Sequence, residues 1–189
     1  MKVLMSQRDL RIPPNNFLFD CLERSWYGFL GNHHIIPYAN VGVVDETIEF
    51  DCLVLSGGPD SVARNVTENN LFAHALKLGK PIFGVCHGAF AVNELTGGEN
   101  ELLDYELILQ HDNQQHEITM EGSRHIVNSF HGQGIRKLGP DMVSLATVDD
   151  GTIEAFKHKE LPIYGVVWHP ERMKFPILPK EVKDLIERD

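Results

Sequence analysis

Cys86 stands between two glycines in the segment PIFGVCHGAF, where a short apolar run meets a helical pattern. The spacing G-x-C-x-G follows the logic of the G-x-S-x-G turn, which presents a nucleophile between a strand and a helix. Gly84 and Gly88 remove side chains that would collide in so sharp a turn. At a helix N-terminus, the dipole and the free N–H groups stabilise a thiolate and can hold an oxyanion. The segment therefore predicts a cysteine nucleophile.

The alternative is a buried structural cysteine beside two ordinary glycines, because free cysteine is common in protein cores. We give that interpretation to Cys21 and Cys52, which lie on apolar stripes. For Cys86, the strand-like run before it and the helical pattern after it favour the nucleophile.

A cysteine nucleophile needs an imidazole as its base, and the imidazole needs a carboxylate to orient it. His169 follows the apolar run 163–168, Pro170 stiffens the turn, and Glu171 comes two residues after the histidine. Taken alone, His-Pro-Glu is most often a turn with a solvated carboxylate. Because ligands bind at the carboxyl ends of the strands in open α/β sheets, this position predicts that His169 and Glu171 face Cys86.

Continuous apolar runs predict the strands that carry these residues, since strands covered on both faces do not alternate. The three clearest runs are Cys52–Leu55, Ile82–Val85 and Ile163–Trp168, with Lys2–Met5 and Ile35–Tyr38 as two further strands. Apolar residues at helical spacing predict three helices. The first has the stripe Phe17, Cys21, Leu22, Phe29 and Leu30 after a cap at Asn15 or Asn16, and the second has Leu71, His74, Ala75 and Leu78 before Gly79. The third covers roughly residues 179–188, with Val182, Leu185 and Ile186 on one face.

Residues 102–156 have a different texture, with short β-like segments between polar turns: ELILQ, HEITM, HIVNSF, MVSLATV and TIEAF. Alternating strands and helices predict an α/β fold with an open, mostly parallel sheet flanked by helices, and this segment predicts an antiparallel excursion from it. With no repeat or linker in 189 residues, we expect a single domain over residues 1–189.

The sharp turn predicted at Cys86, called a nucleophile elbow, and the segment His169-Pro170-Glu171 near the end of the chain together resemble the class I glutamine amidotransferases and the γ-glutamyl hydrolases of the peptidase C26 type. The resemblance covers nearly the whole chain and implies a flavodoxin-like fold. It implies Cys86 as nucleophile, His169 as general base and then acid, and Glu171 as the group that orients His169. The implied reaction cleaves a γ-glutamyl C–N amide bond through a thioester, without a cofactor.

The segment LSGGPD at residues 55–60 is a strong turn signal, and its glycine pair lets backbone N–H groups approach a ligand closely. The resemblance implies that this loop completes the oxyanion hole. Gly57 and Gly58 are the expected donors, together with the backbone N–H of His87.

The segment VNSFHGQ at residues 127–133 is the third landmark. It is similar to the segment that holds the glutamyl group in amidotransferases, and more narrowly to hydrolases of γ-glutamyl-GABA and related amides. The resemblance implies substrate contacts from Asn128, Ser129, Phe130 and His131. Read without the family, it is a polar loop after a strand.

Two positions depart from the family pattern. Phe90 stands where glutaminases usually have a glutamine, which counts against ordinary glutamine as the substrate and makes Phe90 a substrate-site candidate. His87 follows the nucleophile, where it can contact an anionic leaving group, tune the thiolate or point to solvent.

The N-terminal segment 6–9 and the segment 21–30, expected to be helical, resemble stand-alone γ-glutamyl hydrolases found with genes for bacterial surface sugars. One such activity acts on a γ-glutamyl CDP-amidate during phosphoramidate synthesis. Arg8 would suit a phosphate or carboxylate, because its guanidinium donates in pairs. The alternative is a solvated arginine near a terminus.

The formal net charge of −10 counts against nucleic acid and anionic membranes as partners. Three cysteines without a CxxC spacing argue against a disulfide framework and a cysteine zinc site, and the N-terminus is too short for a signal peptide or a membrane span. We therefore expect a cytoplasmic protein. The histidines at 33, 34, 111 and 116 lack the H-E-x-x-H pattern, so no catalytic metal is predicted.

Three functions stay open at this point. The first is a stand-alone γ-glutamyl hydrolase acting on a small molecule. The second is a glutaminase subunit that delivers ammonia to a separate synthase partner. The third is a non-enzymatic redox sensor. The complete His169/Glu171 pair counts against this function, because sensing needs only a reactive thiol.

Overall fold

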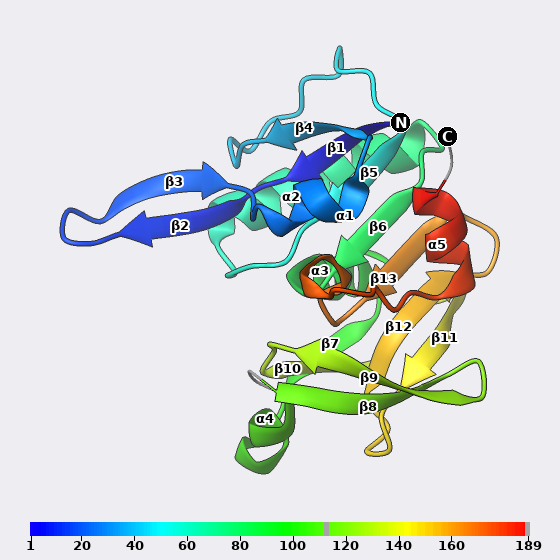
Figure 1. The fold of residues 1–189 in the computed structure, drawn as a ribbon. Coiled ribbons are helices and arrows are strands. Elements are labelled where there is room, and N and C mark those ends of the chain that lie inside the picture. The colour runs from blue at the N-terminus through cyan, green and yellow to red at the C-terminus, as the bar shows by residue number, and fades with distance from the viewer. Residues whose placement is uncertain (112–113, 188–189) are drawn as a thin grey trace.

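The computed structural model describes residues 1–111 and 114–187, and one eleven-stranded sheet runs through it (Figure 1). Five neighbouring strands are parallel. In sheet order they are β4 (His34–Tyr38), β1 (Lys2–Ser6), β5 (Cys52–Leu55), β6 (Ile82–Val85) and β13 (Ile163–Val166). Every residue of β5 and β6 is buried, as their continuous apolar runs predict.

The remaining strands of the sheet form the antiparallel half predicted from residues 102–156. In sheet order after β13 come β12 (Ile153–His158), β11 (Met142–Thr147), β8 (Gln114–Met120) and β9 (Ser123–Ser129). A side branch is made by β10 (Gln133–Lys137), which pairs with β12 and with β7 (Glu99–Leu102).

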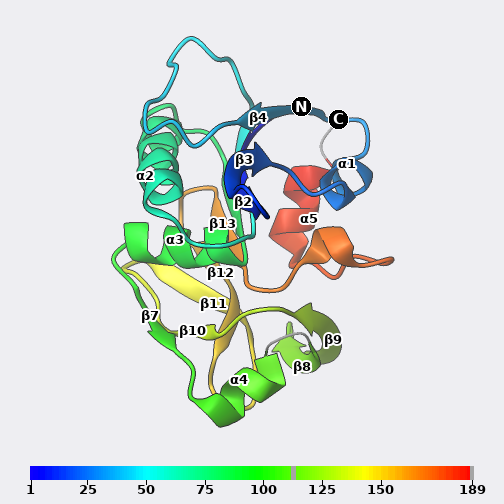
Figure 2. The same ribbon diagram turned by 90° about the vertical axis from the view of Figure 1, so that its left-hand side faces the viewer.

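Helices cover both faces of the parallel half, so its strands have a core on each side (Figure 2). One face packs on α2 (Val62–Lys77) and α3 (His87–Leu95). The other packs on α1 (Ser25–Leu30) and α5 (Lys180–Ile186). Along β1, Val3 and Met5 join the second core while Leu4 joins the first, because successive side chains of a strand point to opposite faces. The fold class predicted from the sequence is therefore confirmed.

The helix expected from Phe17 onwards is wrong in its first half. Residues Phe17–Cys21 form strand β3, which pairs with β2 (Arg8–Ile12), and helix α1 begins only at Ser25. The sequence PPNN between the two strands makes the reversal, because proline stops regular pairing and asparagine tolerates turn conformations.

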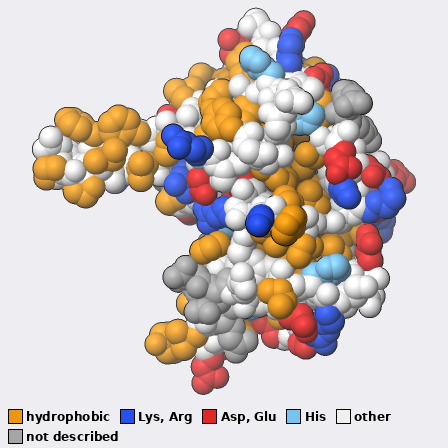
Figure 3. Space-filling model, viewed as in Figure 1, with side chains coloured by type: hydrophobic (Ala, Val, Ile, Leu, Met, Phe, Trp, Pro, Cys, Tyr) orange, Lys and Arg blue, Asp and Glu red, His pale blue; other side chains and the backbone are white. Residues whose placement is uncertain are grey.

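The β2–β3 hairpin extends from the body as an arm (Figure 1), and its tip is largely apolar (Figure 3). Phe17, Leu18 and Phe19 are 61%, 51% and 47% exposed. The spacing of these apolar residues resembles a helical stripe, but their side chains are exposed and do not pack on the core.

A second expectation fails at ELILQ, which lies in helix α4 (Tyr105–His111) and not in a strand. The carboxylate of Asp104 accepts a hydrogen bond from the Leu107 N–H at 3.0 Å, as a helix N-cap does. The other four β-like segments are confirmed as β8, β9, β11 and β12. The C-terminal helix ends at Ile186, and the predicted end at Arg188 lies outside the described residues. None of the described helices combines the length and apolar composition that crossing a membrane requires.

Candidate active site

Cys86 occupies a sharp turn between β6 and α3, with φ +51° and ψ −110°. Such a conformation is costly for a residue with a side chain and is found mainly where function requires it. The glycines on either side are required by packing. A Cβ on Gly84 would lie 2.4 Å from the Gly88 carbonyl oxygen, and a Cβ on Gly88 would lie 2.0 Å from that of Leu55. The G-x-C-x-G spacing thus lets the helix start close against β5 and β6.

His169 and Glu171 follow β13, and the turn η1 (Pro170–Arg172) places their side chains together. The Nδ1 atom of His169 lies 2.6 Å from Oε1 of Glu171, and both residues are buried. Burial disfavours the imidazolium, but hydrogen bonds and charge from Cys86 and Glu171 outweigh it and raise the pKa of His169 to about 9. The structure therefore places the His169 imidazole in contact with both Cys86 and Glu171, and its raised pKa favours the protonated ring.

Asn128 of β9 fixes the backbone of His169 in two ways. Its Nδ2 donates to the His169 carbonyl oxygen, and its Oδ1 accepts from the His169 N–H, each at 2.8 Å. These bonds fasten the end of β13 to the antiparallel half. The side chain of Asn128, a predicted substrate contact, is thus occupied in positioning His169.

The loop Ser56–Pro59 follows β5 and lies directly against His169. A Cβ on Gly57 would come within 2.4 Å of His169 Cε1, so only glycine fits there. Gly58 has φ +145°, and a Cβ on it would lie 2.6 Å from Cβ of Arg8. Of the two glycines expected in the oxyanion hole, Gly57 therefore lies beside His169 and Gly58 beside Arg8. The first N–H groups of a helix such as α3 lack an intrahelical partner, and α3 starts at the neighbouring strand end.

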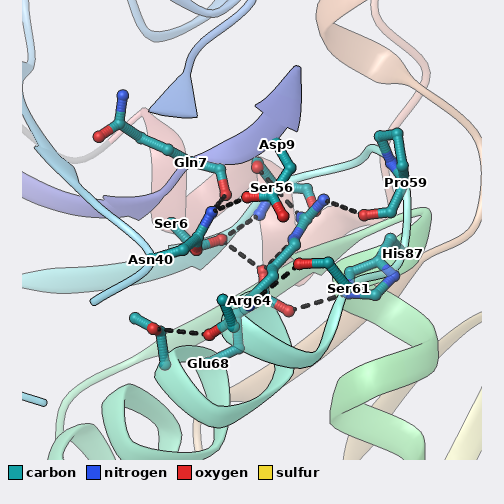
Figure 4. A network of polar contacts seen from close by, with 12 residues as sticks. Ser6, Gln7, Asp9, Asn40, Ser56, Pro59, Ser61, Arg64, Glu68 and His87 are labelled. Carbon is teal, nitrogen blue, oxygen red and sulfur yellow. Dashed lines mark hydrogen bonds and ion pairs between the residues drawn. The ribbon is translucent and has the colours of Figure 1, made fainter. Parts of the chain in front are cut away.

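A buried charge network holds this loop (Figure 4). Arg64 and Glu68 of α2 are fully buried, with Arg64 Nε 2.9 Å from Glu68 Oε1. The Arg64 guanidinium also donates to the carbonyl oxygens of Ser56 and, at 3.2 Å, Pro59. On its other oxygen, Glu68 meets His87 Nε2 at 3.1 Å. One ion pair thus connects the loop to His87, the residue after Cys86, so the His87 side chain faces Glu68 and not solvent.

Glu68 remains charged within this network. Burial favours its neutral form, but hydrogen bonds and charge from His87 and Arg64, with a hydrogen bond from Ser6 at 2.7 Å, lower its pKa overall. The Ser6 hydroxyl also accepts from the Ser56 N–H at 3.0 Å, which gives the loop another anchor.

A pocket of ≈ 160 Å³ opens at Cys86, lined by Gly58, Asp60, Cys86, His87, Phe90, Phe130, His131, Gly132 and Gln133. A second hollow of ≈ 290 Å³ shares Asp60, His87, Phe90 and Gln133 with it. It extends between α2 and α3 towards Asn65, Asn69 and Glu94. Three predicted substrate residues, Phe90, Phe130 and His131, therefore line the pocket, and Arg8, Asn128 and Ser129 do not.

The contacts of Arg8 and Ser129 explain why these two side chains do not line the pocket. Arg8 lies 3.5 Å from Glu23, a carboxylate that also binds Arg172 at 2.8 Å. The Ser129 hydroxyl is buried and donates to the His111 carbonyl oxygen. Both side chains serve the scaffold next to the pocket.

Phe130 lies over the catalytic candidates at the mouth of the pocket. Its ring meets the His169 ring edge-on at a centroid distance of 5.6 Å, and the Arg172 guanidinium lies 4.8 Å from its centroid. An aromatic side chain here shields the imidazole from water while remaining 37% exposed itself.

Sequence inspection misses Arg64 and Glu68, because two charges four residues apart on a helix usually lie in solvent. It also leaves Asp60 and Gln133 unassigned, although both stand inside segments singled out as landmarks. Asp60 and Gln133 lie next to predicted site residues along the chain, and that position could have placed them among the predicted pocket residues.

Comparison with known proteins identifies the family of the chain. The sequence profile of the Peptidase C26 family matches residues 49–171. The chain belongs to the peptidase C26 family. It is accordingly a hydrolase that acts on C–N bonds.

Two relatives and one solved structure extend this result. The chain is 34% identical over 174 residues to gamma-glutamyl-CDP-amidate hydrolase from Campylobacter jejuni, covering 81% of each chain. It is 33% identical over 123 residues to a glutamine-hydrolyzing GMP synthase subunit from Pyrococcus furiosus, covering 63% of this chain and 65% of that one. A glutamine amidotransferase structure from Thermotoga maritima superposes with a TM-score of 0.69 over 98% of this chain and 80% of that one, at 16% identity, and so shares the fold.

Proposed function

We propose that this C26 hydrolase cleaves a γ-glutamyl amide by covalent catalysis, with Cys86 as nucleophile, His169 as acid and base, and Glu171 as its orienter. The observation that carries the proposal is the buried contact chain from Cys86 through His169 to Glu171, on a strained elbow beside the Gly57–Gly58 loop. A merely structural cysteine would need neither the strain nor the imidazole.

In the first half-reaction, the Cys86 thiolate attacks the γ-carbonyl carbon and a C–S bond forms. Backbone N–H groups of Gly57, Gly58 and His87 face the developing oxyanion, and each such donor is typically worth about 3 kcal/mol in the transition state. As the C–N bond breaks, His169 gives its proton to the leaving nitrogen. The products are the free amine and a γ-glutamyl thioester on Cys86.

In the second half-reaction, water replaces the amine. Neutral His169 takes a proton from the water as its oxygen attacks the thioester carbonyl. The C–S bond then breaks, which releases glutamate and restores the Cys86 thiolate beside a protonated His169. Glu171 keeps the imidazole in one orientation through both steps.

For the leaving group, we propose a CDP-amidate or a similar bulky group, as in surface-polysaccharide phosphoramidate synthesis in the cytoplasm. The C. jejuni relative supports this choice, as does the second hollow of ≈ 290 Å³, which adjoins the pocket and offers more space than ammonia needs. Phe90, which stands in place of the usual glutamine, lines both spaces and would contact such a group.

A glutaminase that works with a synthase partner is the second candidate, because the P. furiosus relative belongs to a glutamine-hydrolyzing GMP synthase. Under that function, free glutamine is the substrate. Glutamate release from glutamine would then rise when the synthase binds.

The experiment that separates the two compares γ-glutamyl-CDP-amidate, γ-glutamyl-GABA and glutamine as substrates, with released glutamate as the readout. We expect the bulky amide to be preferred by at least about 100-fold in kcat/KM, which corresponds to about 2.7 kcal/mol in the transition state. Acid quenching followed by mass spectrometry should find the γ-glutamyl adduct on Cys86. A preference for glutamine would favour the glutaminase, and glutamate release without any adduct would refute the covalent mechanism.

A further inference from the structure

Four side chains of the kinds that bind metals converge in the antiparallel half, and one of them, His131, also lines the pocket at Cys86. His111 ends α4, His116 lies on β8, His131 follows β9, and Glu154 lies on β12. One donor atom from each lies within 4.8 Å of the donor atoms of the other three. The chain therefore gathers three imidazoles and a carboxylate from four different elements at one point.

These side chains are buried and lack the hydrogen bonds that burial demands. The side chains of His111, His131 and Glu154 are at most 2% exposed, and that of His116 is 9% exposed. Within the described residues, no hydrogen bond reaches His111 Nδ1, His131 Nε2, either nitrogen of His116 or either oxygen of Glu154. Burying a polar atom without a partner costs about 1–3 kcal/mol, so the four converging donors, one from each side chain, call for a ligand.

The spacing of the donors suits one small cation. Each histidine places a nitrogen 3.4–3.7 Å from a Glu154 oxygen: His111 Nδ1 at 3.7 Å, His116 Nε2 at 3.4 Å and His131 Nε2 at 3.6 Å. Ligand bonds of about 2.0–2.1 Å in a tetrahedron separate neighbouring ligand atoms by about 3.3–3.4 Å. The histidine–Glu154 distances are therefore close to those that a shared ion would impose, while the four donors as a group lie within 4.8 Å and would draw closer together on binding.

Two of the histidines are oriented as metal ligands usually are. His131 Nδ1 lies 2.7 Å from the Gln133 carbonyl oxygen, and His111 Nε2 lies 3.3 Å from Asp150 Oδ2. These oxygens accept the ring N–H, which leaves the lone pair of the other nitrogen facing the cluster.

We propose that His111, His116, His131 and Glu154 bind one Zn²⁺ ion in a closed, structural site. Three imidazoles and one carboxylate suit zinc, and four protein ligands leave no position for a reacting water. The ion would take no direct part in the hydrolytic chemistry. Because His131 also lines the pocket at Cys86, the ion would hold the pocket wall Phe130–Gln133 in place.

The first experiment measures bound zinc in the full-length protein after expression with added Zn²⁺ and dialysis against metal-free buffer. We expect about one zinc per chain, in keeping with one four-ligand site. His116→Ala and Glu154→Gln should each lose it, while His125→Ala, a change at a β9 histidine outside the cluster, should retain it. Cys86→Ala should also retain it, which separates this site from the thiol–imidazole pair, itself capable of binding zinc.

A second measurement uses unsubstituted protein, so it stands even if the ligand variants fail to fold. Removing the metal with a chelator should lower the Tm by about 5–10 °C, and adding Zn²⁺ should restore it, as expected for a ligand that binds only the folded state. Co²⁺ in its place should give the intense visible absorption of a tetrahedral site. Less than about a tenth of an equivalent of zinc, or equal zinc in His116→Ala and His125→Ala, would overturn the proposal, as would loss of the zinc in Cys86→Ala.

Discussion

The two halves of the sheet place their polar residues by different means. In the parallel half, Cys86, His169 and the Gly57 loop each follow the end of a strand, and parallel neighbours bring those ends to one edge. In the antiparallel half, the cluster of His111, His116, His131 and Glu154 comes from four elements whose contact follows only from the whole fold. The first arrangement can be read from local sequence, and the second cannot.

The two halves also differ in what they contribute to the proposed reaction. The parallel half holds every group that the proposed reaction needs, while the antiparallel half supplies the pocket wall and the asparagine that fixes the His169 backbone. If this division is correct, changes in one half should remove the chemistry, while the metal content should depend on the other.

Cys86→Ala tests that division with the largest expected effect. Glutamate release should fall by about 10⁴-fold or more, because the covalent route is lost while the fold remains. Turnover under saturating substrate is the measurement, with circular dichroism as the check on folding. A folded variant with full activity would end the proposed mechanism.

Changing His169 and Glu171 separately should rank the two residues that the proposed mechanism places with Cys86. We expect His169→Ala to reduce kcat by about 10⁴-fold and Glu171→Ala by about 10²-fold, because an orienter matters less than the base. Both rates are measured at saturating substrate with equal protein. An equal loss in the two variants would mean that Glu171 does more than orient the ring.

Arg64→Met tests whether the buried Arg64–Glu68 ion pair of α2 contributes to kcat by holding the loop Ser56–Pro59 in place. It leaves the buried Glu68 carboxylate without its arginine, with only His87 and Ser6 as partners, so the free energy of unfolding should fall by about 3–5 kcal/mol. As the loop carbonyls of Ser56 and Pro59 lose their donor, kcat should also fall, by about 10-fold. Lys77→Met, at an exposed lysine on the same helix, is the matched control.

The double variant Arg64→Met/Glu68→Leu separates the two effects. Removing both charges should recover most of the stability, since no buried charge is left without a partner. The reduced kcat should persist, because the loop still lacks its anchor. If kcat recovers together with stability, the network serves folding alone.

The smallest expected effect is on the pH dependence of stability. The pKa of His169 is raised to about 9 in the folded chain from an ordinary value near 6.5. Its contribution to stability is therefore complete below about pH 6.5 and is lost as the pH rises through about 9. Chemical denaturation across this range should show that loss. Cys86→Ala should reduce it, because the contacts from Cys86 help to raise the pKa of His169.

The residues best predicted from the sequence are those whose neighbours along the chain decide their conformation. The runs at β5 and β6 are apolar throughout, and the glycines around Cys86 have a steric reason that can be read from the spacing. Prediction failed at Phe17–Cys21, where exposed aromatic residues imitate the stripe of a buried helix. Glu154 shows the same limit, because a single acid in an apolar strand gains its meaning only from histidines on other elements.

The exposed aromatic tip of the β2–β3 arm has a consequence for how this protein behaves in concentrated solution. A net charge of −10 should make the molecules repel one another near neutral pH. Near the isoelectric point of about 5.4 that repulsion disappears while the attraction between aromatic tips remains. Solubility should therefore fall sharply in mildly acidic buffer, and replacing Phe17 with a lysine should widen the usable range.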